Sequence, residues 1–168
     1  PLSGHPIWAV ERAQRRWTGL GAQHLLDQQL TAFFASRQCP GLAIRAAMGW
    51  ALEQAQKRQG VISGFHSPLE QSVLQLLLQA KSPVVALLGN LWPMQDCLQG
   101  GKPHWQMAMA VVSMCDTPQR LTREQARERN EQAARLSDAI VIAHASEGGE
   151  LARQSASWRA FDLPVQYL

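Results

Sequence analysis

Short apolar segments alternate with segments of helical periodicity along most of this chain. The apolar segments have the β-branched and aliphatic character of strands and lie at residues 30–35, 61–63, 83–88, 107–114, 138–144 and 164–168. Helices are expected at residues 42–59, 68–80, 123–136 and 150–157. Strands and helices that alternate in this way form right-handed β-α-β units. The sequence therefore predicts an α/β fold: a doubly wound, mainly parallel sheet with helices on both faces.

Length and composition favour a single soluble domain. The chain has 168 residues, enough for one buried core, and no apolar run of membrane-spanning length. Residues 1–28 are polar and rich in Trp, Arg and Gln, and we expect a helix or two there, packed against a main domain at residues 29–168. No secretory signal is evident, and Cys39, Cys97 and Cys115 lack metal-ligand spacing. These features predict reduced thiols in a cytoplasmic protein.

Residues 61–70 predict a strand, a tight turn and the start of a helix. Ser67 is a suitable N-cap, Pro68 suits the first helical turn, and Glu70 stands three residues after Ser67, as a capping box requires. A strand that runs directly into a helix leaves several backbone N–H groups without partners near the positive end of the helix dipole. The turn is therefore predicted to bind an anion, most commonly phosphate.

In doubly wound sheets, ligands bind beyond the carboxyl ends of the strands, where the strand order reverses. Loops at residues 36–41, 63–68 and 145–150 follow predicted strands and carry Gly or small hydroxyl residues, and the first adds Arg37. Together they predict a basic, glycine-lined cleft. A G-x-G-x-x-G fingerprint and a P-loop motif are both missing from the sequence, which argues against a dinucleotide site and a P-loop NTPase.

Arginine supplies most of the positive charge of the chain. The formal net charge is +3, and Arg greatly outnumbers Lys. Many arginines lie in residues 120–135, where Glu124, Glu128 and Glu131 are interleaved. A guanidinium suits phosphate because its donors form a planar fork. The same pattern is also typical of a solvated helix face with i,i+4 ion pairs, and both interpretations remain open on this evidence.

Several motifs in a fixed order resemble the Rossmann-like core of the DNA-processing protein A family (DprA, also called Smf). The motifs are Ala35-Ser36-Arg37, residues 63–70, Arg129-Asn130, residues 136–145 and residues 147–150, preceded by a lead-in at residues 19–26. The resemblance covers residues 19–168. The chain resembles a divergent, core-only member, because Ala35 replaces a glycine of the family motif and residues 65–70 read F-H-S-P-L-E.

This resemblance implies a nucleic-acid-binding protein of DNA processing, uptake and recombination. The implied partners are single-stranded DNA, held in a basic pocket, a RecA-type recombinase and a second copy of the chain, paired through the sheet edge. The phosphate-binding candidates are Ser36, Arg37, Ser63, Gly64, Phe65, His66, Ser67, Arg129, Asn130, Gly148 and Gly149. No catalytic residue, metal or cofactor is expected. Backbone amides and guanidinium groups suit such a role because they hold phosphates without reading base sequence.

Three candidate side chains have two interpretations each. Phe65 either stacks on a base or fills the core beneath the turn. His66 either acts on phosphate, as a hydrogen-bond donor or general acid, or is a neutral histidine bonded to the backbone. Asn130 either fixes a loop or Arg129, or touches the ligand.

Other functions are compatible with the same fold. The first is a mononucleotide sensor. The second is an enzyme similar to the cytokinin-activating phosphoribohydrolases, whose P-G-G-x-G-T-x-x-E signature residues 147–150 echo only faintly. The third is a protein-interaction module that has lost ligand binding. Binding without catalysis is favoured, because the phosphoribohydrolase signature is incomplete.

Overall fold

The computed structural model describes residues 7–87, 109–113 and 122–168. One sheet carries all the described strands, in the order β1-β2-β6-β5-β4-β3-β7-β8. The strands are β1 (Trp8–Arg12), β2 (Arg15–Gly21), β3 (Leu30–Ala35), β4 (Gly60–Ser63), β5 (Val84–Leu87), β6 (Met109–Ser113), β7 (Ala139–His144) and β8 (Val165–Tyr167). The helices are α1 (Gly41–Lys57), α2 (Pro68–Gln79), α5 (Arg123–Leu136) and α6 (Glu150–Ala160), with a 3-10 helix, η1, at Gln23–Asp27.

The strand order reverses between β3 and β7. Strands β3, β4, β5 and β6 follow one another in parallel toward one edge, whereas β7 pairs in parallel with the other side of β3. Strand β8 then extends the sheet beyond β7, also in parallel. The predicted doubly wound, mainly parallel fold is therefore confirmed, and its switch point lies between β3 and β7.

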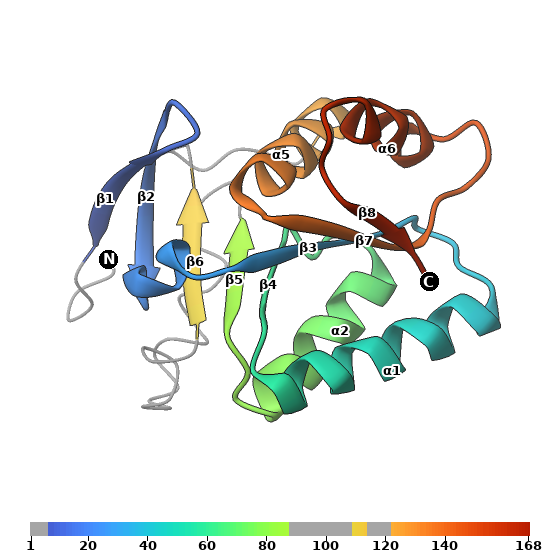
Figure 1. The fold of residues 1–168 in the computed structure, drawn as a ribbon, viewed down its shortest axis with the longest axis horizontal. Helices are drawn as coiled ribbons and strands as arrows, with labels where there is room; N and C mark the ends of the chain where they lie inside the picture. Colours follow the sequence, from blue (N-terminus) through green and yellow to red (C-terminus); the bar gives the residue numbers. More distant parts are fainter. Residues whose placement is uncertain (1–6, 88–108, 114–121) are drawn as a thin grey trace.

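Helices cover the two faces of the sheet in pairs, with α1 and α2 on one face and α5 and α6 on the other (Figure 1). Successive residues of a strand point to opposite faces, so β3 contributes to two cores. Phe33 belongs to the core under α1 and α2, where its ring stacks on Trp50 at 5.1 Å. Phe34 belongs to the core under α5 and α6, where its ring stacks on Trp158 at 4.7 Å. Trp50 is thus a core residue.

The predicted N-terminal helices are wrong. Residues 8–21 form the hairpin β1–β2, which continues the sheet because β2 pairs antiparallel with β6. Only the short η1 is helical in this part of the described chain. The physical reason is burial: Trp17 is 2% exposed and Leu20 is fully buried, and both would lose that burial if β2 did not cover the edge of β6.

The element boundaries differ slightly from the predictions. Helix α1 ends at Lys57, capped by Arg58 in the left-handed conformation (φ 52°), and Gly60 begins β4 instead of ending the helix. The predicted loop at residues 89–102, as well as Cys97 and Cys115, lies outside the described residues. Among the helices that are described, none is long and apolar enough to cross a membrane.

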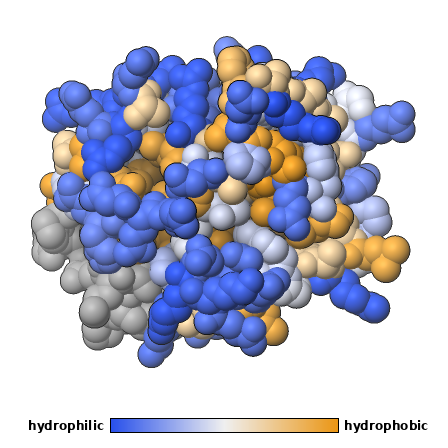
Figure 2. Space-filling view, in the orientation of Figure 1, coloured by the Kyte–Doolittle hydropathy of each residue, from blue (hydrophilic) through white to orange (hydrophobic). Residues whose placement is uncertain are grey.

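Hydrophilic side chains cover most of the face shown in Figure 2, and hydrophobic ones are visible in the gaps between them. Some large apolar side chains are nevertheless exposed in the described regions, including Leu42 at 80% and Leu52 at 51% on α1 and Phe161 at 76%. Helix α1 therefore buries one side against the sheet and presents apolar residues on its outer side.

Candidate functional site

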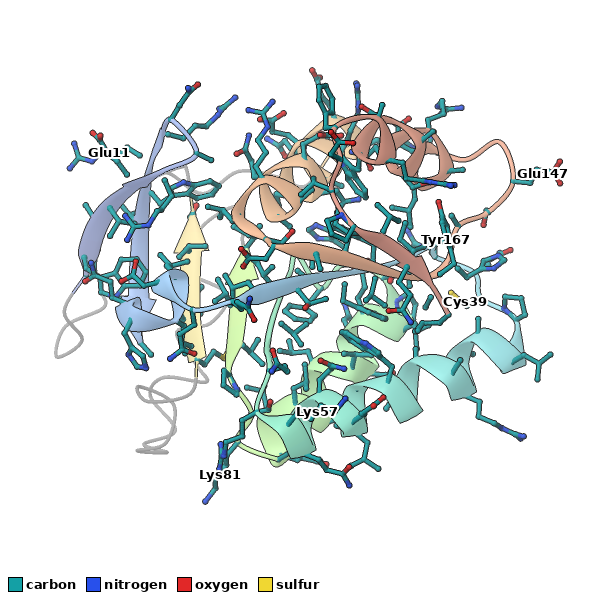
Figure 3. All side chains as sticks on the ribbon, in the orientation of Figure 1. Glu11, Cys39, Lys57, Lys81, Glu147 and Tyr167 are labelled. Atoms are coloured by element: carbon teal, nitrogen blue, oxygen red, sulfur yellow. The ribbon has the colours of Figure 1, made fainter. Side chains whose placement is uncertain are left out.

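A cleft of about 810 Å³ opens at the carboxyl ends of β3 and β7, next to the switch point. Its walls come from the loop after β3, the start of α2, the first half of α5 and the start of α6. Figure 3 shows Cys39 and Glu147, which lie in the loops after β3 and β7, near the same end of the molecule. The topology thus brings together chain segments that are more than a hundred residues apart.

The buried carboxylate of Glu70 fills the anion site that the sequence predicts at the start of α2. Its Oε1 accepts hydrogen bonds from the backbone N–H groups of His66 (2.8 Å) and Ser67 (3.1 Å). Its Oε2 accepts from the N–H of Ala35 at 2.9 Å. The predicted capping box is present, since the Ser67 hydroxyl accepts from the N–H of Glu70 at 3.3 Å. These amides are therefore bound to an internal carboxylate, and the prediction that the turn holds a phosphate is corrected.

Burial raises the pKa of Glu70, and the hydrogen bonds from Ala35, Ser67 and His66 oppose that shift. Glu70 is 3% exposed, so its charged form loses nearly all contact with water. The three N–H donors replace that water. The carboxylate is thus a structural anion that joins β3 to the start of α2.

Ser63, Gly64 and Phe65 lie beneath the cleft wall and do not line it. Ser63 is fully buried, and its hydroxyl accepts from the N–H of Phe65 at 3.1 Å. Phe65 is 6% exposed and packs in the core under α1 and α2, with a left-handed backbone (φ 50°). Of its two interpretations, the core role is the observed one, because a buried ring has no face free for a base. The predicted phosphate contacts of these three residues are corrected accordingly.

His66 lines the cleft in its neutral form. Burial, followed by the nearby charge of Arg129, lowers the pKa of His66 to about 4. Its Nε2 is buried and has no hydrogen-bond partner among the described residues. The ring lies against Gly64, where an added Cβ would fall 2.7 Å from Cε1 of His66. The imidazole therefore needs glycine at position 64 to pack in this place.

Ser36 and Arg37 come from the loop after β3. The Ser36 hydroxyl accepts from the N–H of Ser146 at 2.9 Å, and its own N–H donates to the carbonyl of His144 at 2.9 Å. Ser36 thus ties the loop after β3 to the loop after β7. Arg37 is exposed, lines the cleft and makes no hydrogen bond or ion pair with another described residue. An adjoining hollow of about 550 Å³ extends the cleft past Arg37 and Arg123 toward Pro68.

Two arginines of the cleft share one carboxylate. Arg127 Nε lies 3.0 Å from Glu150 Oε1, and Arg153 Nη2 lies 3.0 Å from Glu150 Oε2. Arg153 also donates to the carbonyl of Gly148 at 2.8 Å, and Gly148 has a left-handed backbone (φ 71°) that favours glycine. Glu150 therefore holds both guanidinium groups at the start of α6.

The amino end of α6 has no side-chain cap. Gly149 is its N-cap, and no described side chain accepts a hydrogen bond from the first turn. By contrast, α2 is capped by Ser67 and α5 by Thr122, each through a capping box. The first N–H groups of a helix attract anions when nothing else binds them. Of these three helix starts in the cleft, that of α6 is the one without a side-chain cap.

Asn130 belongs to a hydrogen-bonded network between α5 and α6. Its Nδ2 donates to Gln154 Oε1 at 3.3 Å, and Gln154 Nε2 donates to the carbonyl of Arg127 and to Glu131 Oε1. Trp158 Nε1 donates to the other oxygen of Glu131 at 3.1 Å. Asn130 thus ties α5 to α6, whereas the sequence suggested a loop or Arg129 as its partner. Its Oδ1 is buried and has no partner among the described residues.

The structure brings about half of the predicted site residues to the cleft. Those that line it are Ser36, Arg37, His66, Ser67, Asn130 and Gly149. Arg129 and Gly148 lie outside the lining, although the charge of Arg129 acts on His66. The lining carries four arginines and three glutamates, so that positive charge exceeds negative charge by one. These residues are Arg37, Arg123, Arg127, Arg153, Glu70, Glu124 and Glu150.

The sequence analysis does not identify Arg123, Arg127 and Arg153 as cleft residues, and it includes Glu150 only as the last position of a predicted cleft loop. The spacing of Arg123 and Arg127 by four positions places them on one face of a helix, and this signal was available from the sequence. The pairing of Arg127 with Glu150 was not available, because it depends on how α5 packs beside α6. The arginine-rich run is thus neither a uniform solvated face nor a uniform binding face.

These observations define an α/β protein of the Rossmann-like class with a cleft at its topological switch point. No protein-family model and no curated protein matches the sequence. Solved structures do match, and the predicted DprA-like fold is confirmed. DNA processing protein A from Helicobacter pylori, described in its mode of binding single-stranded DNA, matches with a TM-score of 0.78 at 13% identity, over 98% of this chain and 80% of that chain.

Two further solved structures share the fold, and they differ in what they are described to be. DprA from Streptococcus pneumoniae matches with a TM-score of 0.76 at 14% identity, over 99% of this chain, and this chain spans 63% of its length. A molybdenum cofactor binding protein from Rippkaea orientalis matches with a TM-score of 0.57 at 12% identity, over 83% of this chain and 76% of that chain. Identities this low establish a shared fold, and the same fold hosts more than one function.

Proposed function

We propose that this protein binds the sugar-phosphate backbone of single-stranded DNA in the cleft at the switch point. The observation that carries this proposal is the meeting of four arginines with the uncapped start of α6 in one cleft. Guanidinium groups and free helix N–H groups are both strong partners for phosphate. The similarity of the fold to that of Helicobacter pylori DprA supports nucleic acid as the source of the phosphate.

Arg37 and Arg123 are the first contacts in this proposal. Both are exposed, and both line the cleft and its adjoining hollow. Neither guanidinium group makes a hydrogen bond or ion pair with another described residue. A phosphate between them needs to displace only water. Arg129 is a further candidate contact from the sequence, but it is not among the lining residues.

The cleft suits a backbone better than bases. Among its described lining residues there is no Phe, Tyr or Trp, so the large aromatic rings that usually stack on bases are missing from this part of the structure. Contacts to phosphate alone carry no direct sequence information. We therefore expect binding that depends weakly on base sequence and strongly on salt.

A small phosphorylated ligand, such as a mononucleotide, is the second candidate. The cleft volume of about 810 Å³ falls within the range of about 300–1,000 Å³ that is typical of small-molecule pockets. The similar fold of the Rippkaea orientalis protein supports this candidate, because that protein binds a molybdenum cofactor. A phosphoribohydrolase-like enzyme is a variant of the same idea, and release of free base from a nucleoside monophosphate would reveal it.

One titration separates these candidates. Fluorescence anisotropy of a labelled oligo-dT is measured at two salt concentrations, with AMP and dTMP as unlabelled competitors. We expect salt-sensitive binding that R37A and R123A each weaken by about tenfold, since a hydrogen bond to a charged group contributes about 1.5–3 kcal/mol. R45A removes an equal charge from the outer side of α1 and is the control. Saturable binding of a mononucleotide without any oligonucleotide binding would favour the second candidate.

We also propose the biological setting that the DprA resemblance implies: DNA processing, uptake and recombination in the cytoplasm, a RecA-type recombinase as partner, and a homodimer. The exposed Leu42 and Leu52 of α1, at 80% and 51%, support a protein contact on that side. Sedimentation velocity of the free protein tests the homodimer. Co-sedimentation with a RecA-type recombinase on single-stranded DNA tests the partner.

A further inference from the structure

A second cationic site lies at the tip of the hairpin β1–β2. A hollow of about 520 Å³ is lined there by Ala13, Gln14, Arg15, Arg16 and Arg135. None of these lining residues is acidic, and none also lines the cleft. The cluster therefore concentrates positive charge more strongly than the cleft, where three glutamates offset four arginines.

The hairpin holds this cluster on a tight turn. Arg12 pairs directly with Arg15, so that Ala13 and Gln14 are the only two turn residues, and both have left-handed backbones (φ 50° and 63°). Such a turn matches the twist of the two strands, but glycine or asparagine is the usual occupant. The short connection allows little movement at Arg15 and Arg16.

The tip is also fixed to the rest of the molecule. Strand β2 pairs with β6, and the indole N–H of the buried Trp17 donates to the carbonyl of Arg12 at 3.1 Å. Arg15 Nη2 lies 3.2 Å from Glu128 Oε1, which links the tip to α5. Arg16 and Arg135, in contrast, are exposed, and no hydrogen bond or ion pair joins either guanidinium group to another described residue. Two guanidinium groups are thus available on a rigid base.

Helix α5 connects this site to the cleft. Arg123 lines the cleft near the start of the helix, and Arg135 lines the hairpin site near its end. Twelve residues separate them, which is about 18 Å along the helix axis. A mononucleotide cannot reach both sites. A strand whose phosphates rise by about 3.4 Å, as in a duplex, spans that distance with about five nucleotides.

We propose that the hairpin tip is a second phosphate-binding site, which holds the backbone of the same single strand that occupies the cleft. This inference rests on the proposed function and adds a requirement to it: affinity increases with strand length beyond about five nucleotides. The ligand class is a phosphodiester chain. Free mononucleotides are expected to bind in the cleft without contacting the hairpin tip.

The test compares dT4 with dT20 by fluorescence anisotropy. Wild-type protein should bind dT20 at least tenfold more tightly than dT4. R16A/R135A should remove most of that gain, leave dT4 binding unchanged, and reduce the slope of log K against log salt by about 1.4, since each contact with a single strand contributes about 0.7. R37A/R123A should weaken the binding of both oligonucleotides. R45A/R159A removes two exposed arginines elsewhere and is the matched control.

The possible failures are distinguishable. If R16A/R135A weakens the binding of dT20 no more than R45A/R159A does, the proposal of a hairpin site is wrong and the proposal of a cleft site is unaffected. If R16A/R135A weakens the binding of dT4 and of dT20 equally, the hairpin tip does not extend the cleft site, and the inference is also overturned. If R37A/R123A changes neither oligonucleotide, the proposed function itself fails. Because all six substituted arginines are exposed, circular dichroism should show an unchanged fold in every variant.

Discussion

Glu70 and Ala35 are joined by a hydrogen bond of 2.9 Å from the backbone N–H of Ala35 to the Glu70 carboxylate. This bond connects the start of α2 to the end of β3, two segments that form the base of the cleft. The same carboxylate accepts from His66 and Ser67, so that one side chain satisfies three backbone donors. The position of the cleft wall therefore depends on a single buried anion.

E70A is expected to lower the free energy of unfolding by about 3 kcal/mol, because it leaves buried N–H groups without an acceptor. E70Q retains one amide oxygen as acceptor and should cost less than E70A. Urea unfolding followed by circular dichroism measures both. The control is E53A, which removes an exposed glutamate paired with Lys57 and should cost less than about 0.5 kcal/mol. Equal effects of E70A and E53A would show that the bond network contributes little.

His66 should make the stability depend on pH in the acid range. Its pKa is lowered to about 4 in the folded protein, while an unfolded histidine titrates near its ordinary value of 6.5. The unfolded state therefore binds more protons between these values, and stability is lost as the pH falls from 6.5 to about 4. A shift of this size corresponds to roughly 3 kcal/mol.

The measurement compares urea unfolding of wild-type protein and H66Q at pH 7 and pH 4. H66Q should lose less stability between the two pH values, because it has no imidazole to protonate. Glu70 titrates in the opposite sense, since its raised pKa favours the folded state on acidification, but it is present in both proteins. H24Q removes an exposed histidine outside the cleft and controls for the loss of a histidine. An identical acid loss in H66Q and wild type would contradict this assignment.

Gly64 and His66 should be energetically coupled. A Cβ on Gly64 would meet the His66 ring, with Cε1 at 2.7 Å, so G64A should lower stability by about 1–3 kcal/mol through overpacking. In an H66A background the same substitution should cost much less, and a double-mutant cycle gives the difference. G49A is the matched control, because a Cβ there meets nothing within 4 Å and alanine favours the helix. An equal cost of G64A in both backgrounds would locate the strain elsewhere.

Glu150 should oppose ligand binding. Its two oxygens occupy Arg127 and Arg153, each at 3.0 Å, at the open start of α6. E150Q is expected to release both guanidinium groups and to tighten oligo-dT binding about three- to tenfold. It should also lower stability by about 0.3–1 kcal/mol, because an acidic residue favours the first turn of a helix.

E147Q is the control for the charge itself. Glu147 lies three residues before Glu150, in the loop after β7, and Figure 3 shows its side chain at the outer end of the molecule. Anisotropy titrations with both variants separate the two effects. If E147Q tightens binding as much as E150Q does, the change in net charge explains the gain, and the release of the arginines does not.

The order of strands and helices was readable from the chain because its signals are local. Apolar periodicity predicts the segments from β3 to β8, and the capping box of Ser67 and Glu70 marks the start of α2 to the residue. Both signals arise within a few neighbouring positions, where the period of a helix or a strand determines which side chains share a face. The convergence of the loops after β3 and β7 then follows from the rules of parallel sheets.

The chemistry of the cleft was decided by contacts between distant residues. Glu70 meets Ala35 across 35 positions, Arg127 meets Glu150 across 23, and β2 covers β6 to form the hairpin edge in place of the expected helices. Local pattern cannot encode these pairings, since each depends on how whole elements pack. Whether a backbone amide or a guanidinium group is open to phosphate is determined by what already binds it, and that is a property of the packed molecule.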